Sequence, residues 1–201
     1  MSELEIGRLL RAGTTGCVVG CRVQQLGAPA FGGMVRIPLE DGLQVYGLIH
    51  DIRIDDDGLV RQLVTAPEVS QDVILDNRQN RNVPLEISVI FIGYEKGGLV
   101  SHLLPPRPPL SLDAIFICDD AEIARFSGAG RFGYFRHVLR DPELPVGELL
   151  AAHLQQAALA HAQTGRQDWL RAATQELIVL LRDDYPTLMT VLSTVSEIYP
   201  E

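Results

Sequence analysis

The chain is 201 residues long, 46% of them hydrophobic and 21% charged, and its formal net charge is −9. These values favour a folded protein with one substantial core and exclude intrinsic disorder as its general state. The acidic charge excludes a protein whose whole surface binds nucleic acid, because such binding requires lysine and arginine at the phosphates. No apolar run reaches the roughly 18 residues of a membrane helix, and acidic residues stand where a signal peptide is basic. We therefore expect a cytoplasmic protein without a membrane partner.

The first part of the chain, to about Ile117, has the pattern of β-structure: short runs rich in Val, Ile and Leu, interrupted by clusters of Gly, Pro and Asp. The turn "DDDG" at residues 55–58 lies between two such runs and predicts a β-hairpin. Because helical periodicity is nearly absent before residue 118, we expect a closed barrel or a sandwich, and a barrel also removes exposed strand edges. The expected strands are residues 6–11, 17–26, 34–38, 44–54, 59–64, 83–94 and 114–118.

The chain has three cysteines, Cys17, Cys21 and Cys118. Cys17 and Cys21 belong to one expected strand, where a four-residue spacing separates them by about 13 Å, too far for a disulfide. The spacing also differs from the paired short spacing of structural zinc sites, and no histidine lies nearby in sequence. We therefore expect buried, unbridged cysteines in a reducing compartment, and no metal site.

After about Asp141 the pattern becomes helical. Three runs, residues 144–165, 168–185 and 186–199, carry apolar residues at helical spacing, with Gly165 at an expected helix end and Pro186 at an expected helix start. The two patterns together predict an α+β fold by segregation, in which a small closed β-barrel is followed by about three helices. The expected division is a barrel over residues 1–120, a connector over residues 121–142 and a helical region over residues 143–201.

Several weak motifs follow one another in the first 120 residues. They are Ile6-Gly7-Arg8 at the first strand, Gly32-Gly33 before "MVRI", the long run "VYGLIHDI", and the proline-flanked arginine of "LPPRPPLSLDAIF" before the last strand. In this order they resemble the HAS-barrel, the domain shared by HerA-type DNA translocases and the N-termini of rotary ATP synthase subunits. The resemblance implies a closed barrel that makes lateral contacts in a ring and offers a docking face to a partner such as a nuclease.

The chain lacks the ATPase domain that follows this barrel in HerA-type translocases. Its only lysine, Lys96, is followed by Gly97, whereas a phosphate-binding loop ends in Lys-Ser or Lys-Thr. We therefore expect no ATP hydrolysis, no cofactor and no enzymatic activity. Gly128, Gly130 and Gly133 have the spacing of a dinucleotide-binding motif, but a poor strand precedes them, and they favour a flexible connector.

The connector is both basic and aromatic. Between residues 125 and 140 it carries Arg125, Arg131, Arg136, His137 and Arg140, without any Asp or Glu, beside several Phe and Tyr residues. Such a pattern would bind a nucleic-acid strand through phosphate contacts and base stacking. The alternative is that the aromatic rings pack on the barrel while the arginines face water or the acidic helices. The net charge of −9 favours this alternative.

Two further segments carry arginines suited to contact with an anion or a partner. Residues 76–82 are expected to form a loop between strands, and the proline stretch before the last strand is expected to be a stiff crossing with a single arginine. The candidate contact residues are Arg78, Arg81, Arg107, Arg131, Arg136 and Arg140.

From the sequence we expect a non-catalytic assembly or partner-docking module on a HerA-like barrel, associated with a DNA-processing machinery. Its expected partners are further copies of itself, another protein, or both. A nucleic-acid-binding accessory protein that uses the connector is the less favoured alternative.

Overall fold

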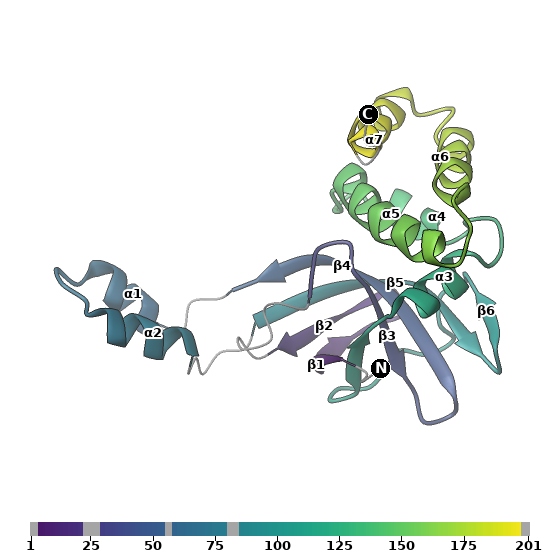
Figure 1. The fold of residues 1–201 in the computed structure, drawn as a ribbon. Helices are drawn as coiled ribbons and strands as arrows, with labels where there is room; N and C mark the ends of the chain where they lie inside the picture. Colours follow the sequence, from purple (N-terminus) through teal and green to yellow (C-terminus); the bar gives the residue numbers. More distant parts are fainter. Residues whose placement is uncertain (1–3, 22–28, 55–57, 80–84, 198–201) are drawn as a thin grey trace.

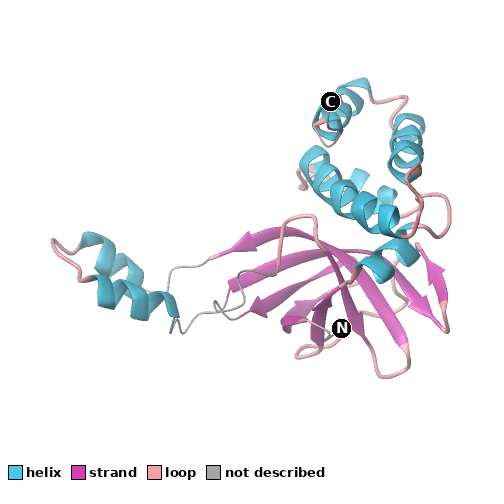
Figure 2. Cartoon of the chain, viewed as in Figure 1, coloured by secondary structure: helices cyan, strands magenta, loops and turns pink. Residues whose placement is uncertain are grey.

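The computed structural model describes residues 4–21, 29–54, 58–79 and 85–197. Figure 1 shows the strands gathered in one body, with α5, α6 and α7 above it in that view and α1 and α2 to one side, and Figure 2 distinguishes helices from strands. The strands are β1 (Glu5–Ala12), β2 (Gly16–Cys21), β3 (Met34–Pro38), β4 (Leu43–Arg53), β5 (Leu85–Lys96), β6 (Leu99–Ser101) and β7 (Ala114–Ile117). The helices are α1 (Leu59–Thr65), α2 (Gln71–Gln79), α3 (Asp120–Ser127), α4 (Phe135–Leu139), α5 (Val146–Gln163), α6 (Trp169–Leu180) and α7 (Tyr185–Ser196).

Six strands of the seven-stranded sheet close into a barrel. They are paired in the order β2–β1–β7–β3–β4–β5, and β5 pairs again with β2 to complete the ring. Neighbouring strands are antiparallel throughout, and β6 extends the sheet from β5 outside the ring. The closed barrel followed by helices that the sequence predicts is therefore confirmed. Closure pairs both sides of each of these six strands.

Glycines allow two close approaches that position the elements. At Gly47, where β4 and β5 change register, a Cβ atom would lie 2.4 Å from Cγ1 of Val89 and 2.8 Å from the carbonyl oxygen of Ile90. Gly32 has a φ of 78°, and a Cβ atom there would lie 2.5 Å from Cβ of Ala152 on α5. These glycines therefore let the barrel bend and let α5 approach it.

The predicted strand hairpin after β4 is wrong. Residues 59–64 belong to α1, and α2 follows, so that a helical hairpin is inserted between β4 and β5. Since β4 pairs with β3 on one side and with β5 on the other, no side of it is left for another strand. Leu59, Val60, Leu63 and Val64 also have helical spacing, which the strand interpretation overlooked. The turn residues 55–57 lie outside the described residues.

The other predicted strands are present, with changes at their ends. Residues 22–26 and 83–84, which the prediction assigned to strands, lie outside the described residues. The prediction missed β6, whose hairpin with β5 turns at Gly97 and Gly98, both with positive φ. The expected loop at residues 76–82 is also wrong in part, because α2 continues to Gln79; residues 80–82 are not described.

Two groups of buried side chains stabilise the fold. One group fills the barrel and includes Val45, Ile87 and Phe91. The other lies between the outer face of β3, β4 and β5 and the helices, and it includes Tyr46 and Ile90. Alternation of side chains along β4 and β5 therefore supplies both cores, because successive residues point to opposite faces of the sheet.

The predicted connector, residues 121–142, contains α4 and most of α3. Its residues Phe126, Tyr134 and Phe135 are fully buried, and the Phe126 ring lies 4.6 Å from the Tyr46 ring, centroid to centroid. Phe126, Tyr134 and Phe135 therefore pack in the core, as the favoured alternative predicts, whereas Phe132 is half-buried against Phe135 and Trp169. The glycines from Gly128 onward follow helix α3, so the dinucleotide motif lacks the preceding strand that it requires.

The three cysteines are buried and are not joined by a disulfide, as predicted. Burial raises the pKa of Cys17 to about 12 and also raises the pKa of Cys118, so both thiols remain protonated near neutral pH. Within the described ranges, no helix combines the length and the apolar character that a membrane crossing would need.

Candidate functional site

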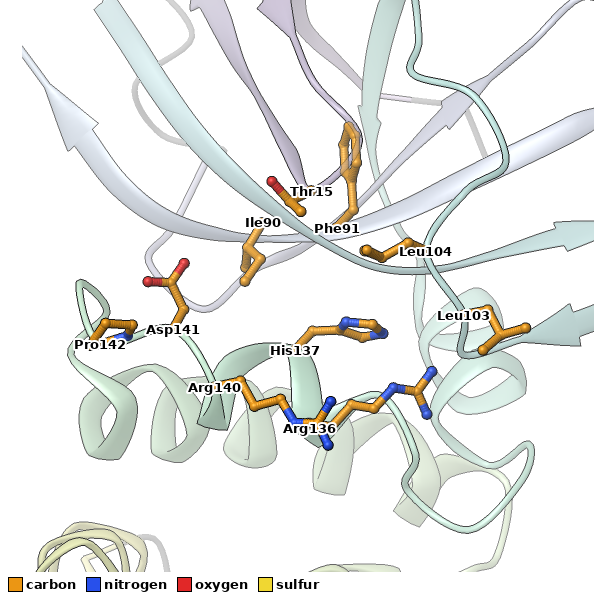
Figure 3. Close-up of a pocket in the computed structure, with 10 residues that line it drawn as sticks. All are labelled: Thr15, Ile90, Phe91, Leu103, Leu104, Arg136, His137, Arg140, Asp141 and Pro142. Atoms are coloured by element: carbon orange, nitrogen blue, oxygen red, sulfur yellow. The ribbon is translucent and has the colours of Figure 1, made fainter.

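A groove lies between α4 and the outer wall of the barrel, and we call it the α4 groove (Figure 3). Its volume is about 640 Å³. The turn between β1 and β2, the middle of β5 and the chain after β6 form one side, while α4 and the turn after it form the other. The residues that line it are Thr15, Ile90, Phe91, Leu103, Leu104, Arg136, His137, Arg140, Asp141 and Pro142.

Helix α4 contributes the polar side chains of the groove. Phe135 and Val138 are buried on the other face of this short helix and hold it in the core. Arg136 and Arg140 are four residues apart, and the Arg140 amide donates to the Arg136 carbonyl oxygen at 3.2 Å. The two arginine side chains therefore begin on the same face, one helical turn apart, with His137 beside them.

The carbonyl oxygen of His102, just after β6, anchors α4 to the barrel. It accepts a hydrogen bond from the Arg136 guanidinium and another from Nε2 of His137 at 2.8 Å. Since a carbonyl oxygen only accepts, the His137 ring carries its proton on Nε2 and leaves Nδ1 as an acceptor. In the same way, Nε2 of His102 donates to the Phe126 carbonyl oxygen at 3.2 Å. These hydrogen bonds orient the side chains of Arg136 and His137 at the edge of the groove.

The barrel side of the groove is apolar. Ile90 points outward from β5 toward α4, and Leu103 and Leu104 continue this surface from the proline stretch (Figure 3). Leu103 is 61% exposed, although leucine is usually buried. Phe91 contributes only the edge of its backbone, because its ring belongs to the barrel core. The groove thus offers an apolar surface opposite two guanidinium groups.

The fixed charges of the groove are two guanidinium groups, from Arg136 and Arg140, and the carboxylate of Asp141. Burial lowers the pKa of His137 below its ordinary value, and the neighbouring arginines lower it further, so the imidazole is neutral near pH 7. The lining therefore has a net positive charge. This combination suits a ligand that has a carboxylate or phosphate next to an apolar group.

The structure brings two of the six candidate contact residues together, Arg136 and Arg140. Arg131 is exposed on the same connector but does not line the groove. Arg125, another residue of the basic pattern, is bound elsewhere: its guanidinium lies 3.0 Å from Glu95 and donates to the Tyr46 hydroxyl at 3.0 Å. The basic pattern of the connector is therefore divided between an internal contact and the groove.

The remaining candidates lie apart from the α4 groove. The Arg107 guanidinium is 3.0 Å from a carboxylate oxygen of Asp41, so this arginine connects the proline stretch to the turn between β3 and β4. Arg78 belongs to α2, and its side chain is not described. Arg81 lies outside the described residues.

Sequence reasoning missed the barrel side of the groove, namely Thr15, Ile90, Leu103 and Leu104. Ile90 had only a partial signal: in a strand it points to the face opposite Val89 and Phe91, but the run is apolar on both faces and does not indicate which one is outer. Nothing local identifies the other three, since only the closure of the barrel brings the β1–β2 turn and the proline stretch beside α4.

Among the residues that the structure describes, no three His, Cys, Asp or Glu side chains come close enough together to hold a metal ion. No protein-family model matches the chain, and a search of curated proteins returns no match. What the structure itself shows is a small closed antiparallel barrel with one additional strand.

Proposed function

We propose that this protein is a non-catalytic partner-docking and assembly module built on a HerA-like barrel, and that it serves a DNA-processing machinery. The observation that carries the proposal is the α4 groove, in which the exposed Leu103 and Leu104, beside the buried Ile90, face the guanidinium groups of Arg136 and Arg140. A segment of protein that has apolar side chains next to Asp or Glu would satisfy both sides of this groove.

The groove favours a protein segment over a phosphate chain because its barrel side is apolar. Leu103 and Leu104 are exposed to solvent, and covering them would add hydrophobic free energy to the contact with the arginines. The hydrogen bonds from Arg136 and His137 to the His102 carbonyl oxygen hold this side of the groove in place before a partner binds. Such preorganisation reduces the entropy lost on binding.

The proposal is tested with short fluorescein-labelled peptides and the full chain. A peptide of alternating leucine and glutamate should bind more tightly than one of alternating leucine and lysine, as measured by fluorescence anisotropy. The Arg140→Glu variant should weaken binding of the acidic peptide by about tenfold. The Arg131→Glu variant is the matched control, because Arg131 is exposed on the same connector outside the groove. Equal binding of both peptides, or equal loss in both variants, would contradict the proposal.

The nucleic-acid alternative retains one favourable observation, the pair of guanidinium groups in the groove, which would hold phosphates. It lacks the exposed rings that base stacking requires, because Phe126, Tyr134 and Phe135 are buried. This alternative predicts that a labelled oligonucleotide binds at low salt, less tightly as salt rises, and not to a variant with alanine at Arg131, Arg136 and Arg140. No binding at low salt would remove it.

A further inference from the structure

The helical hairpin of α1 and α2 has no core of its own. None of its described side chains is buried, and its apolar residues include Val64, 78% exposed, Val73, 45% exposed, and Leu75, 49% exposed. Figure 1 shows it projecting beyond one end of the barrel, away from α4. A pair of helices with this many uncovered apolar side chains is a surface that another molecule can bury.

The two helices are also short. α1 has 7 residues and α2 has 9, whereas isolated helices shorter than about 12 residues are marginal in water. Helices of this length ordinarily depend on packing of an apolar face against a neighbour. Among the described side chains the hairpin shows no such buried face, and a surface of another molecule can supply this packing.

The charges of α2 match those of the α4 groove. Asp72 and Asp76 are four residues apart on α2. Arg136 lies in α4 and Arg140 caps its end four residues later, so each pair is separated by about 6 Å along the helix axis. Val73 and Leu75, which are adjacent to Asp72 and Asp76 in sequence, are exposed on α2.

The same combination, with opposite charge, occurs in the groove. There the guanidinium groups stand opposite Ile90, Leu103 and Leu104. The hairpin therefore presents to the groove both the apolar side chains and the acidic residues that its lining requires.

We propose that the hairpin of one copy of this chain docks into the α4 groove of another copy. This inference rests on the proposed docking function and names its occupant as the chain itself. Each chain has one hairpin and one groove, which are different surfaces. The contact is therefore head-to-tail, and it produces a closed ring or a pair of chains that exchange hairpins.

The experiment reverses one charge on each side in the full chain. Asp72→Arg alters the hairpin and Arg140→Glu alters the groove, and the mass of each variant is measured by light scattering across a concentration series. The wild-type chain should form oligomers, and each single variant should dissociate at a concentration at least about tenfold higher than the wild type. The variant with both substitutions should regain association, because the pair is restored with its charges exchanged. Asp183→Arg is the control, since Asp183 is an exposed acid between α6 and α7.

Mixing the two single variants distinguishes docking of the hairpin into the groove of another copy from docking into the groove of its own chain. At a concentration where each single variant is dissociated, an equal mixture of the Asp72→Arg and Arg140→Glu chains should associate, because one chain supplies an intact hairpin and the other an intact groove. A monomeric wild type, unchanged masses in the single variants, or a double variant without rescue would overturn the inference. If the wild type is monomeric but the acidic peptide still binds and depends on Arg140, the docking function stands and the occupant is a different protein. If the peptide also fails, both proposals fail.

Discussion

The main body of the molecule and the α1–α2 hairpin differ in how far their apolar side chains are buried. The barrel and the helices packed on it bury theirs in two cores, one inside the barrel and one on its outer wall. In the hairpin, which is similarly rich in Val, Leu and Ile, the described apolar side chains are exposed or only half-buried. Apolar composition therefore does not by itself stabilise an element; the stabilisation requires a surface that covers it.

Because of this difference, we expect the body to determine the stability of the fold and the hairpin to determine association with other molecules. Substitutions in the body should lower the free energy of unfolding, whereas substitutions in the hairpin should leave that free energy unchanged and alter association instead. Each prediction below tests one side of this division.

The largest effect is expected at the centre of the barrel. Phe91→Ala should lower the free energy of unfolding by about 3 to 5 kcal/mol, because it removes a ring that is fully buried and leaves a cavity. Urea denaturation followed by circular dichroism measures this loss. Val64→Ala, in the hairpin, is the comparison and should change the value by less than about 0.5 kcal/mol. If the two variants lost similar amounts of unfolding free energy, the proposed difference in stability between body and hairpin would be wrong.

Acid should destabilise the body through His153. This ring is buried, with Nε2 bonded to the Tyr134 hydroxyl at 3.0 Å, and burial lowers its pKa from about 6.5 to about 4. The unfolded chain therefore binds the proton first, so the stability present above about pH 6.5 is lost as the pH falls toward about 4. The loss from this residue approaches about 3 kcal/mol.

Denaturation midpoints measured between neutral and acidic pH test this expectation. His153→Gln should flatten the pH dependence, because glutamine does not acquire a charge. His161, buried against Trp169 with its pKa also lowered to about 4, should keep part of it. His137→Gln is the comparison and should flatten the pH dependence less, since that ring is only half-buried. A profile for His153→Gln as steep as that of the wild type would assign the acid sensitivity to other groups.

A smaller loss of unfolding free energy is expected at Gly47, where the barrel wall leaves no space for a side chain. Gly47→Ala should destabilise the body by about 2 kcal/mol, because its Cβ would meet Val89 and the Ile90 carbonyl oxygen. Gly58, before α1, has a φ of 79°, and no heavy atom lies within 4 Å of the place that a Cβ would take, so Gly58→Ala strains the backbone of the hairpin alone. Thermal unfolding of the body should respond to the first change and not to the second.

The smallest effect is expected from polar residues in the hairpin. A variant with Val64→Ser and Val73→Ser should change the free energy of unfolding of the body by less than about 0.5 kcal/mol, since both side chains are exposed. Chemical denaturation at low protein concentration, where association is weakest, measures this change. A loss above about 1 kcal/mol would mean that the hairpin contributes to the stability of the body.

Residues 59–64 were predicted as a strand but form helix α1, because their sequence pattern fits both structures. Residues 59–64 carry four apolar residues in six, and both a buried strand and one face of a helix have this composition. The choice depended on whether β4 had a free side, and its pairing with β3 and β5 leaves none. The run from Val89 to Ile92 is apolar at every position, which fits a strand buried on both faces, and only the structure places Val89 and Phe91 in the barrel core and Ile90 in the outer one.

The sequence by itself determined the two halves of the fold, the buried cysteines and the packing of the connector's aromatic residues. These features follow from local periodicity, turn residues and the hydrophobic character of each segment. Only the tertiary structure decided which arginines share a site, because Arg136 and Arg140 meet Ile90, Leu103 and Leu104 through barrel closure and through the bonds to the His102 carbonyl oxygen. Contacts between residues so distant in the chain have no local signal, and pairing of whole strands sets them.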